Sequence, residues 1–406
     1  MFTRMRARWH LVLGRFLARL GWYGLAAKQF QSAIGIFPRH LIAHCLLGWT
    51  YQALQQHEKA LAAFDQAHQI APNSPYAHAY KARSWMQFGK YQQAADALNR
   101  AFRIEPKYAT DPLKVEALAQ CYCHLGQIEK AHETYLAAER LNPNNAELVF
   151  RVGWALMKLE RYQEAEIQLK RAASLNPNNA NVSYDLGLAL YHLRKFDESR
   201  AVFQTAASLN PKNPDVHIAT ALTFKDERRF ADAEQALQQA LRIEPNNSEA
   251  YLQMSVLHGE EGRWEESLVA AKKLVELRPT DEVGYWAMAG AYQELKRYPE
   301  EIDACHQALG LNPGSYPALE SLAWAYGELE RYADAVDVIC RAIKIRPDLP
   351  YLHGWLAQAY GKLGNLKEAA KEREALAKLD PQMAADLDRF ISEEKKHVAD
   401  RSEETL

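Results

Sequence analysis

Apolar residues recur at helical spacing in pairs of short segments along most of the chain. In residues 146–179, the first segment places small or apolar residues at i, i+3, i+4 and i+7, which is one face of an α-helix: Val149, Val152, Gly153 and Leu156. The second segment has a similar spacing: Tyr162, Ala165, Leu169 and Ala172. Only Glu160 and Arg161 separate them, which leaves room for no more than a tight turn. Because no segment shows the alternation of a β-strand, we predict an all-α fold.

Proline residues recur at a fixed interval and mark the ends of these helix pairs. Proline lacks the backbone donor that a helix interior needs, so each one ends the second helix of its pair. The interval is 34 residues, except for 37 between Pro106 and Pro143, where residues 109–111 are an insertion. A fixed period of this length predicts stacked supersecondary units. The series is Pro38, Pro72, Pro106, Pro143, Pro177, Pro211, Pro245, Pro279, Pro313, Pro347 and Pro381.

The units resemble the tetratricopeptide repeat (TPR), which has a recurring pattern of small, aromatic and proline residues. The second unit shows this pattern with Leu47, Gly48, Tyr51, Ala60, Phe64, Ala67 and Pro72. The resemblance covers residues 7–383 and implies a right-handed α-solenoid of eleven helix–turn–helix repeats. Residues 1–6 are then an N-terminal arm, and residues 384–406 a capping helix and tail. The repeats start at residues 7, 41, 75, 112, 146, 180, 214, 248, 282, 316 and 350.

Small residues at two positions of the repeat predict close packing of the paired helices. Position 8 holds Gly48 and Gly153 in two of the repeats, and position 20 holds Ala165 in the fifth. A larger side chain at Ala165 is therefore expected to cost about 1–3 kcal/mol by overpacking. Glu301 departs from the pattern, because it stands where Ala is expected.

The sequence shows no motif of catalysis. It lacks a P-loop, a dinucleotide-binding glycine motif, a nucleophile elbow and a zinc-protease motif. His40 and His44 form the best candidate for a metal-ligand pair, but His44 occupies position 4, which normally packs between the helices. Five cysteines indicate a reducing compartment, and no apolar run reaches the roughly 18 residues of a membrane span. We predict a cytoplasmic, non-enzymatic protein with no cofactor, metal or small-molecule ligand.

In the TPR family, the first helix of each repeat lines a concave groove, and positions 2, 5, 9, 12 and 13 commonly contact a peptide. Carried over to this chain, these positions hold several aromatic residues, which are favoured anchors in interfaces. The competing interpretation is that aromatic residues at position 5 only pack against their neighbours. The aromatic candidates are Trp49, Phe150, Trp154, Tyr184, Tyr191, Trp286 and Trp324.

Charge is distributed unevenly, although the net charge of the whole chain is only -2. Residues 1–111 contain 14 Lys and Arg against 5 Asp and Glu, whereas residues 246–406 contain 19 against 29. A groove with this asymmetry would take an acidic ligand segment near the first repeat and a basic one near repeats 7–10. The alternative interpretation is that these charged residues form an ordinary polar face in contact with solvent. The basic candidates are Arg8, Arg15, Arg19 and Arg83, and the acidic candidates are Asp226, Glu260, Glu294 and Glu328.

These features favour a protein–protein interaction scaffold that holds a peptide or helix of its partner in the groove. The alternative is an adaptor peripheral to an anionic membrane, because residues 1–57 contain seven Lys and Arg and no acidic residue. Against it, the apolar residues of the first helix, Leu13, Phe16, Leu17 and Leu20, are expected to be packed inside the first repeat. Nucleic acid is disfavoured as a partner, because the acidic C-terminal half would repel phosphates.

Overall fold

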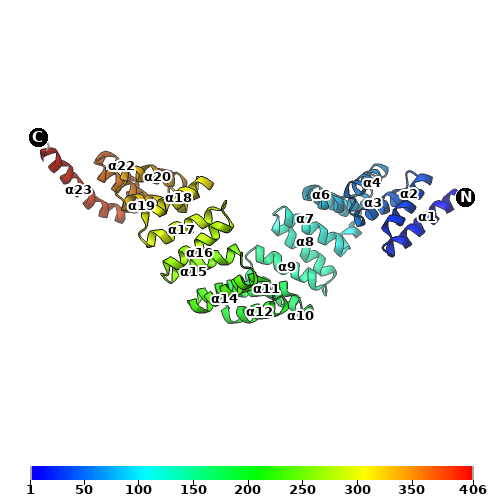
Figure 1. Ribbon diagram of the computed structural model, residues 1–406. Helices are drawn as coiled ribbons and strands as arrows, with labels where there is room; N and C mark the ends of the chain where they lie inside the picture. Colours follow the sequence, from blue (N-terminus) through cyan, green and yellow to red (C-terminus); the bar gives the residue numbers. More distant parts are fainter. Residues whose placement is uncertain (1, 405–406) are drawn as a thin grey trace. The chain divides into compact units, whose positions relative to one another are not determined.

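The computed structural model describes the backbone of residues 2–404 and, within that range, the side chains of residue 3 and residues 5–392. Over residues 2–404 the chain forms α-helices and one 3-10 helix but no strand, which confirms the all-α prediction (Figure 1). Met1 and residues 405–406, parts of the expected arm and tail, lie outside the described residues.

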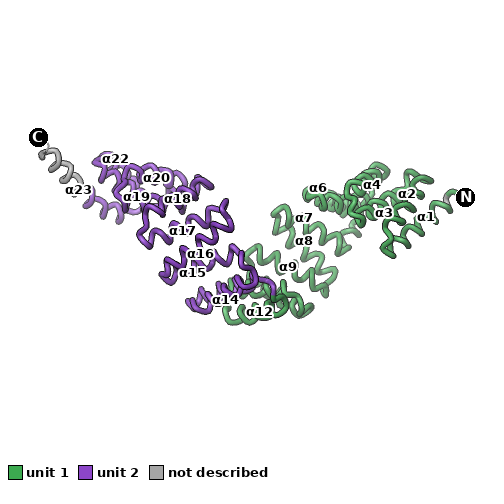
Figure 2. The backbone as a smooth tube through the Cα atoms, viewed as in Figure 1, with its two compact units in different colours: residues 1–211 green, residues 212–406 purple. Residues whose placement is uncertain are grey.

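The helices form pairs, one for each repeat, and the pairs divide into two compact units (Figure 2). Unit 1, Met1–Pro211, contains α1 (Phe2–Arg19), α2 (Tyr23–Ile36), α3 (Leu41–Ala53), α4 (His57–Ile70), α5 (Pro75–Gln87), α6 (Tyr91–Ile104), η1 (Pro106–Thr110), α7 (Pro112–His124), α8 (Ile128–Leu141), α9 (Ala146–Lys158), α10 (Tyr162–Leu175), α11 (Ala180–His192) and α12 (Phe196–Leu209). Unit 2, Lys212–Leu406, contains α13 (Pro214–Asp226), α14 (Phe230–Ile243), α15 (Ser248–Glu260), α16 (Trp264–Leu277), α17 (Glu282–Glu294), α18 (Tyr298–Leu311), α19 (Tyr316–Glu328), α20 (Tyr332–Ile345), α21 (Pro350–Lys362), α22 (Leu366–Leu379) and α23 (Pro381–Glu404).

The turn inside each pair depends on one residue with a left-handed backbone. In all eleven repeats this residue is position 15, and its φ lies between 57° and 79°. Five repeats place glycine there, which adopts this conformation at little cost: Gly21, Gly89, Gly126, Gly262 and Gly364. The other six hold residues with a side chain: Gln55, Glu160, Arg194, Arg228, Lys296 and Glu330. These six turns are locally strained, and the packing of the two helices holds them in place.

The small residue at position 8 lets the second helix press a large side chain onto the first. A Cβ atom added to Gly153 would lie 2.8 Å from Cγ of Leu169, so no side chain fits there without movement. The same close approach occurs at Gly14, Gly48 and Gly187, which face the fully buried rings of Phe30, Phe64 and Phe203. The predicted close packing of paired helices is therefore confirmed at these repeats.

The N-terminal end of unit 1 differs from the sequence expectation. Helix α1 begins at Phe2, so the described part of the expected arm continues this helix. The expectation that all four apolar residues of the first predicted helix are packed is wrong for Phe16 in α1 and for Leu20 directly after it, which are 58% and 49% exposed. Leu13 and Leu17 are half-buried. The reason is that no helix precedes α1 in the described chain, so one of its sides stays uncovered.

The insertion at residues 109–111 and the C-terminal helix are both ordered and contact the neighbouring repeats. Residues 109–111 fall in η1 and at the N-cap of α7, where the Asp111 carboxylate accepts a hydrogen bond of 3.1 Å from the amide of Leu113. Helix α23 packs against α21 and α22 through buried Leu387 and Ile391. None of the described helices has a stretch long and apolar enough to span a bilayer.

Candidate functional site

A groove of about 890 Å³ opens on unit 1, lined mainly by the first helices of repeats 1–4, α1, α3, α5 and α7. Its size lies in the upper range of ligand-binding clefts. The lining residues are Arg15, Ala18, Arg19, Phe30, Leu46, Trp49, Tyr76, Ala79, Tyr80, Arg83, Met86, Leu98, Tyr108, Asp111, Leu113, Lys114, Glu116, Ala117 and Gln120. We call this surface the N-terminal groove.

The N-terminal groove carries unpaired positive charge. Arg15, Arg19 and Arg83 are exposed, and no carboxylate among the described side chains forms an ion pair with any of them. Lys114 differs, since its ammonium group is paired with Asp111. A guanidinium group presents several donors in a fixed plane and remains charged at any physiological pH. The three arginines are therefore free to bind carboxylate or phosphate groups of a ligand.

Aromatic rings form the walls of the N-terminal groove and are held in place from behind. The Trp49 ring packs edge-on against Tyr23, with 5.8 Å between centroids, and the Tyr80 ring stacks on buried Phe64 at 5.7 Å. The Tyr108 ring is 7% exposed and packs edge-on against Tyr76 at 5.4 Å. Such rings offer a large apolar area at little entropic cost, because their rotamers are already restricted.

The pKa of the Tyr80 phenol responds to both the burial and the positive charge of the groove. Burial raises the pKa of Tyr80, while the positive charges of Arg83 and Arg15 act in the opposite direction. The phenol is therefore protonated at neutral pH and remains a hydrogen-bond donor.

Four of the residues predicted from sequence meet in the N-terminal groove: Arg15, Arg19, Trp49 and Arg83. Sequence reasoning missed position 6 of the repeat, which supplies Leu46, Tyr80 and Ala117 to the lining. Tyr80 could have been found from the large aromatic residue at this position of a first helix. Tyr108 could not, because it comes from η1, which lies outside the regular repeat.

The remaining candidates of unit 1 are not part of this lining. Phe150 is 6% exposed and packs in the core, so it is unavailable as a groove anchor, and packing explains its position 5 aromatic ring. Trp154 is half-buried, with the ammonium of Lys158 5.8 Å from its ring centroid. Tyr184 and Tyr191 are half-buried, and Arg8 is exposed.

Unit 2 has a smaller aromatic cavity near its C-terminal end. Trp324 is 40% exposed, and its ring lies 5.8 Å from that of Trp355. Both rings, Glu328 and Phe390 of α23 line a cavity of about 230 Å³. Trp286 is half-buried in α17 and is not among the lining residues. Sequence reasoning missed Trp355, which also stands at position 6.

The predicted series of acidic residues in unit 2 is exposed but partly engaged with the protein itself. The Glu260 carboxylate accepts a hydrogen bond of 2.9 Å from the Lys225 ammonium, and Glu328 accepts one of 3.0 Å from the Tyr298 hydroxyl. Glu294 is exposed and forms no ion pair with the described side chains. Asp226 is exposed as well. Neighbouring side chains thus weaken the charge that this series offers to a ligand.

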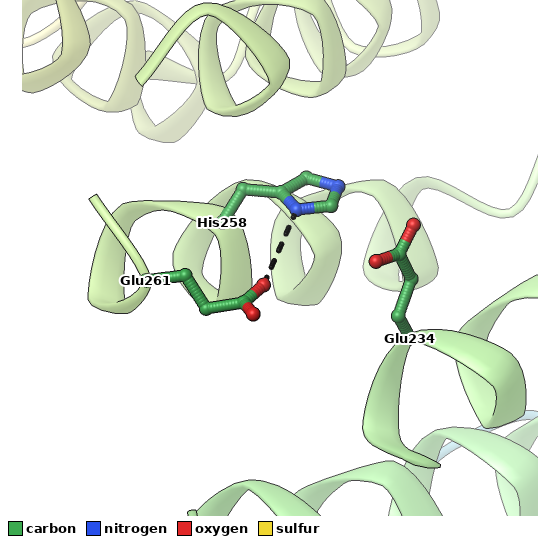
Figure 3. Close-up of side chains that lie close together, drawn as sticks. All are labelled: Glu234, His258 and Glu261. Carbon is green, nitrogen blue, oxygen red and sulfur yellow. Dashed lines mark ion pairs between the residues drawn. The ribbon is translucent and has the colours of Figure 1, made fainter. Parts of the chain in front are cut away.

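One cluster has residue types that suit a metal ion, Glu234, His258 and Glu261, whose ligand atoms lie within 4.8 Å of one another (Figure 3). Arg263 already supplies positive charge there, with Nη1 donating to Glu234 at 2.7 Å and to Glu261 at 3.1 Å. Burial and the charge of Arg263 also lower the pKa of His258. We assign this cluster to ion pairing.

His40 and His44, the candidate metal-ligand pair, form hydrogen bonds near the start of α3. The Nδ1 atom of His40 accepts a hydrogen bond of 3.2 Å from the amide of Ala43 and caps α3. The Nε2 atom of His44 lies 2.8 Å from the carbonyl oxygen of Pro38. Both side chains have structural partners, which explains their presence without a metal.

Models of the tetratricopeptide repeat match residues 153–214, 225–292, 316–349 and 351–383, and a model of the N-terminal TPR region of Psidin matches residues 49–180. Phagocyte signaling-impaired protein of Drosophila pseudoobscura pseudoobscura is 28% identical over 129 residues, and protein bimA of Emericella nidulans is 23% identical over 141 residues. These segments make up 31% and 35% of this chain but only 12% and 16% of those proteins.

Solved structures with a similar arrangement of helices include yeast Tom70, which is 16% identical with 98% of both chains covered and a TM-score of 0.44. Cut9–Hcn1 of the APC/C is 12% identical, with 95% of this chain and 96% of the other covered and a TM-score of 0.45. A TPR protein of Parabacteroides merdae is 16% identical, with 60% and 97% covered and a TM-score of 0.48. The family models along the chain and the eleven helix pairs show that the chain belongs to the tetratricopeptide repeat family.

Proposed function

We propose that this protein is a non-enzymatic cytoplasmic adaptor that holds an acidic segment of a partner protein in the N-terminal groove. One observation carries the proposal: Arg15, Arg19 and Arg83 line the same groove, and none has an ion-pair partner among the described side chains. Arginines that are left without partners beside fixed aromatic rings suit a peptide that combines carboxylates with apolar or aromatic side chains.

The geometry supports an elongated ligand in this groove. The lining comes from successive first helices, so a segment that contacts Arg15 on α1 and Arg83 on α5 lies in the groove that the Trp49 ring on α3 also lines. Carboxylates would pair with the guanidinium groups, and an apolar side chain between them would lie against the rings. A short helix and an extended peptide both have this form.

A displayed library of random peptides tests the proposal. Sequences selected on the intact protein should be enriched in Asp and Glu, and they should be lost with the variant Arg15→Glu/Arg83→Glu. The matched control is Arg103→Glu, which reverses a charge at an exposed site in α6 outside the groove lining. Selected peptides that lack acidic residues, or that bind the groove variant unchanged, would contradict the proposal.

Peripheral association with an anionic membrane is a second candidate function. It is favoured by the exposed arginines of α1, Arg8, Arg15 and Arg19, in a segment of 57 residues without a single Asp or Glu. Clusters of basic residues bind anionic headgroups through long-range attraction, which salt weakens. Flotation of the protein with vesicles that contain phosphatidylglycerol tests this function, and absence of any binding at low salt would exclude it.

A further inference from the structure

Helix α1 is apolar on two opposite sides. Its buried side contains Ala7, Leu11, Gly14 and Ala18, and Gly14 lies against the ring of Phe30 in α2. Five large apolar residues lie on the other side, four in α1 and Leu20 directly after it, between 49% and 64% exposed: Met5, Trp9, Val12, Phe16 and Leu20. At roughly 100° per residue, these five fall within about 80° around the helix axis. We call them the α1 stripe.

The equivalent positions are occupied differently in the other repeats. Trp9 and Phe16 stand at positions 3 and 10 of repeat 1. In repeats 2–6 and 8–11 both positions are buried, apart from Lys114. None of these buried residues is larger than leucine: Ala43, Thr50, Ala77, Ser84, Cys121, Leu148, Ala155, Val182, Ala189, Ala250, Leu257, Gly284, Ala291, Ala318, Ala325, Leu352 and Ala359.

Side chains at these positions are limited in size because the second helix of the preceding repeat packs there. A Cβ atom added to Gly284 would lie 2.7 Å from a methyl group of Val275 in α16. Trp9 and Phe16 are too large for a helix at this distance, so the α1 stripe is not shaped to receive another repeat. This argues against a second copy that stacks end to end on α1.

A repeat face that is exposed to water is expected to carry polar residues. Repeat 1 instead exposes a contiguous group of aromatic and aliphatic side chains, which is typical of a surface that is covered in use. Trp22, the N-cap residue of α2, and Leu25 in α2 are also exposed, by 57% and 49%.

The charge around the α1 stripe indicates what covers it. Arg8, Arg15 and Arg19 fall along one edge of the stripe when the helix is drawn at roughly 100° per residue, and Arg6 falls along the other. All seven charged residues of the first 57 are Lys or Arg, so two copies that met through this surface would repel each other. An apolar stripe with tryptophan and flanking arginines fits the boundary between lipid headgroups and acyl chains.

We propose that the α1 stripe inserts into the interfacial region of an anionic lipid surface, while the flanking arginines contact the headgroups. This inference rests on the second candidate function and deepens it, because insertion differs from electrostatic contact alone. It also identifies the inserted side chains as Trp9, Val12 and Phe16, at the centre of the stripe. Burial of these side chains would make binding resistant to salt that removes a purely electrostatic complex.

Flotation of the full chain with phosphatidylcholine vesicles, with and without phosphatidylglycerol, tests the insertion. The variant Trp9→Gln/Val12→Gln/Phe16→Gln should bind anionic vesicles at least about tenfold more weakly than the unchanged protein. Ile167→Gln/Val269→Gln is the matched control, since both residues are exposed (65% and 68%) and belong to other repeats. Circular dichroism should show unchanged melting for both variants, because all five substituted side chains are exposed.

Trp9 gives a second readout that does not depend on these variants. Bromine-labelled acyl chains should quench part of the tryptophan fluorescence of the unchanged protein. This quenching should be lost in Trp9→Phe, because the substitution removes one of nine tryptophans and leaves the other eight. Equal vesicle binding by the stripe variant, with complete release by salt and no quenching, would overturn insertion and leave the second candidate function standing. No vesicle binding by the unchanged protein would overturn both. A dimer without lipid that the stripe variant loses would show that a second copy covers the stripe, which also overturns the inference.

Discussion

The charged candidate residues of the two units differ in the sign of their charge, in the repeat position that they occupy and in the partners of those charges. In the N-terminal groove, Arg15 and Arg83 stand at position 9 and have no ion-pair partner among the described residues. In unit 2, Glu260 and Glu328 stand at position 13 and accept hydrogen bonds from Lys225 and Tyr298. The fold is the same in both units, so function depends on which surface groups remain available to a ligand.

The two units also differ inside the core, at position 20. This position is Ala165 in repeat 5 and Glu301 in repeat 9, and both are fully buried. Neither carboxylate oxygen of Glu301 has a hydrogen-bond partner, and burial raises the pKa of Glu301 to about 8. Repeat 9 therefore buries a carboxyl group at a position where repeat 5 has only a methyl group. We expect this buried carboxyl group to lower the stability of unit 2.

The largest expected effect concerns ligand affinity. Reversing Arg15 and Arg83 to Glu should weaken binding of an acidic peptide by more than about 100-fold, because two charge-assisted hydrogen-bonding groups become repulsive. The reciprocal triple variant Glu260→Lys/Glu294→Lys/Glu328→Lys in unit 2 should change the same affinity by less than about threefold. Fluorescence anisotropy of a labelled peptide measures both, and a larger effect from the unit 2 variant would reverse the comparison.

The second effect is on the stability of unit 2. Glu301→Ala should stabilise the protein by about 2 kcal/mol, because a buried carboxyl group without partners is removed. Since the pKa of Glu301 is raised from its ordinary value of 4.5 to about 8, the folded state holds a proton that the unfolded state releases, and stability falls as the pH rises between these values.

Thermal unfolding of Glu301→Ala should therefore show a larger gain above this pH range than below it. The control is Asp303→Ala, which removes an exposed carboxylate from the same helix and should change little. An equal gain at all pH values would contradict the assigned ionisation of Glu301.

The third effect probes the same position in unit 1. Ala165→Leu should destabilise the protein by about 1–3 kcal/mol, because the paired helices leave no room for the added atoms. The control Ala201→Leu adds the same atoms at an exposed position of α12 and should be nearly neutral. Chemical denaturation measures both variants, and equal stability of the two would show that position 20 is not tightly packed.

The smallest effect concerns the strained turns. Glu160→Gly should stabilise unit 1 by about 0.5–1 kcal/mol, because glycine adopts the positive φ of 58° at position 15 without strain. Gly262→Ala makes the reverse change in unit 2, where φ is 74°, and should destabilise it. Denaturation midpoints that shift in the opposite directions would refute the role of this backbone conformation.

Much of the fold could be predicted from the sequence because the repeat constrains it at many places. Local geometry and close packing explain the proline period, the glycines at position 8 and the helical spacing. Each of the eleven repeats therefore predicts the same pair of helices. The non-glycine turn residues, such as Glu160, could not be predicted, because packing of the helices outweighs their local preference.

The candidate site was only partly predictable. Arg15, Trp49 and Arg83 follow from the repeat register, but the register does not reveal which side chains are buried or paired. Phe150 is buried by packing against neighbouring helices, and Glu260 is paired with Lys225, which is 35 residues away in sequence. The exposure of the α1 stripe could not be predicted either, because an average repeat has a neighbour on both sides and repeat 1 has only one in the described chain.

Photo-crosslinking of a selected acidic peptide, followed by mass spectrometry of the adducts, tests the central claim most directly. We expect adducts on α1, α3, α5 and α7, within residues 15–120, and their loss in Arg15→Glu/Arg83→Glu but not in Arg103→Glu. Adducts confined to unit 2, or adducts on unit 1 that persist after the charge reversal, would contradict the assignment of the N-terminal groove as the peptide-binding site.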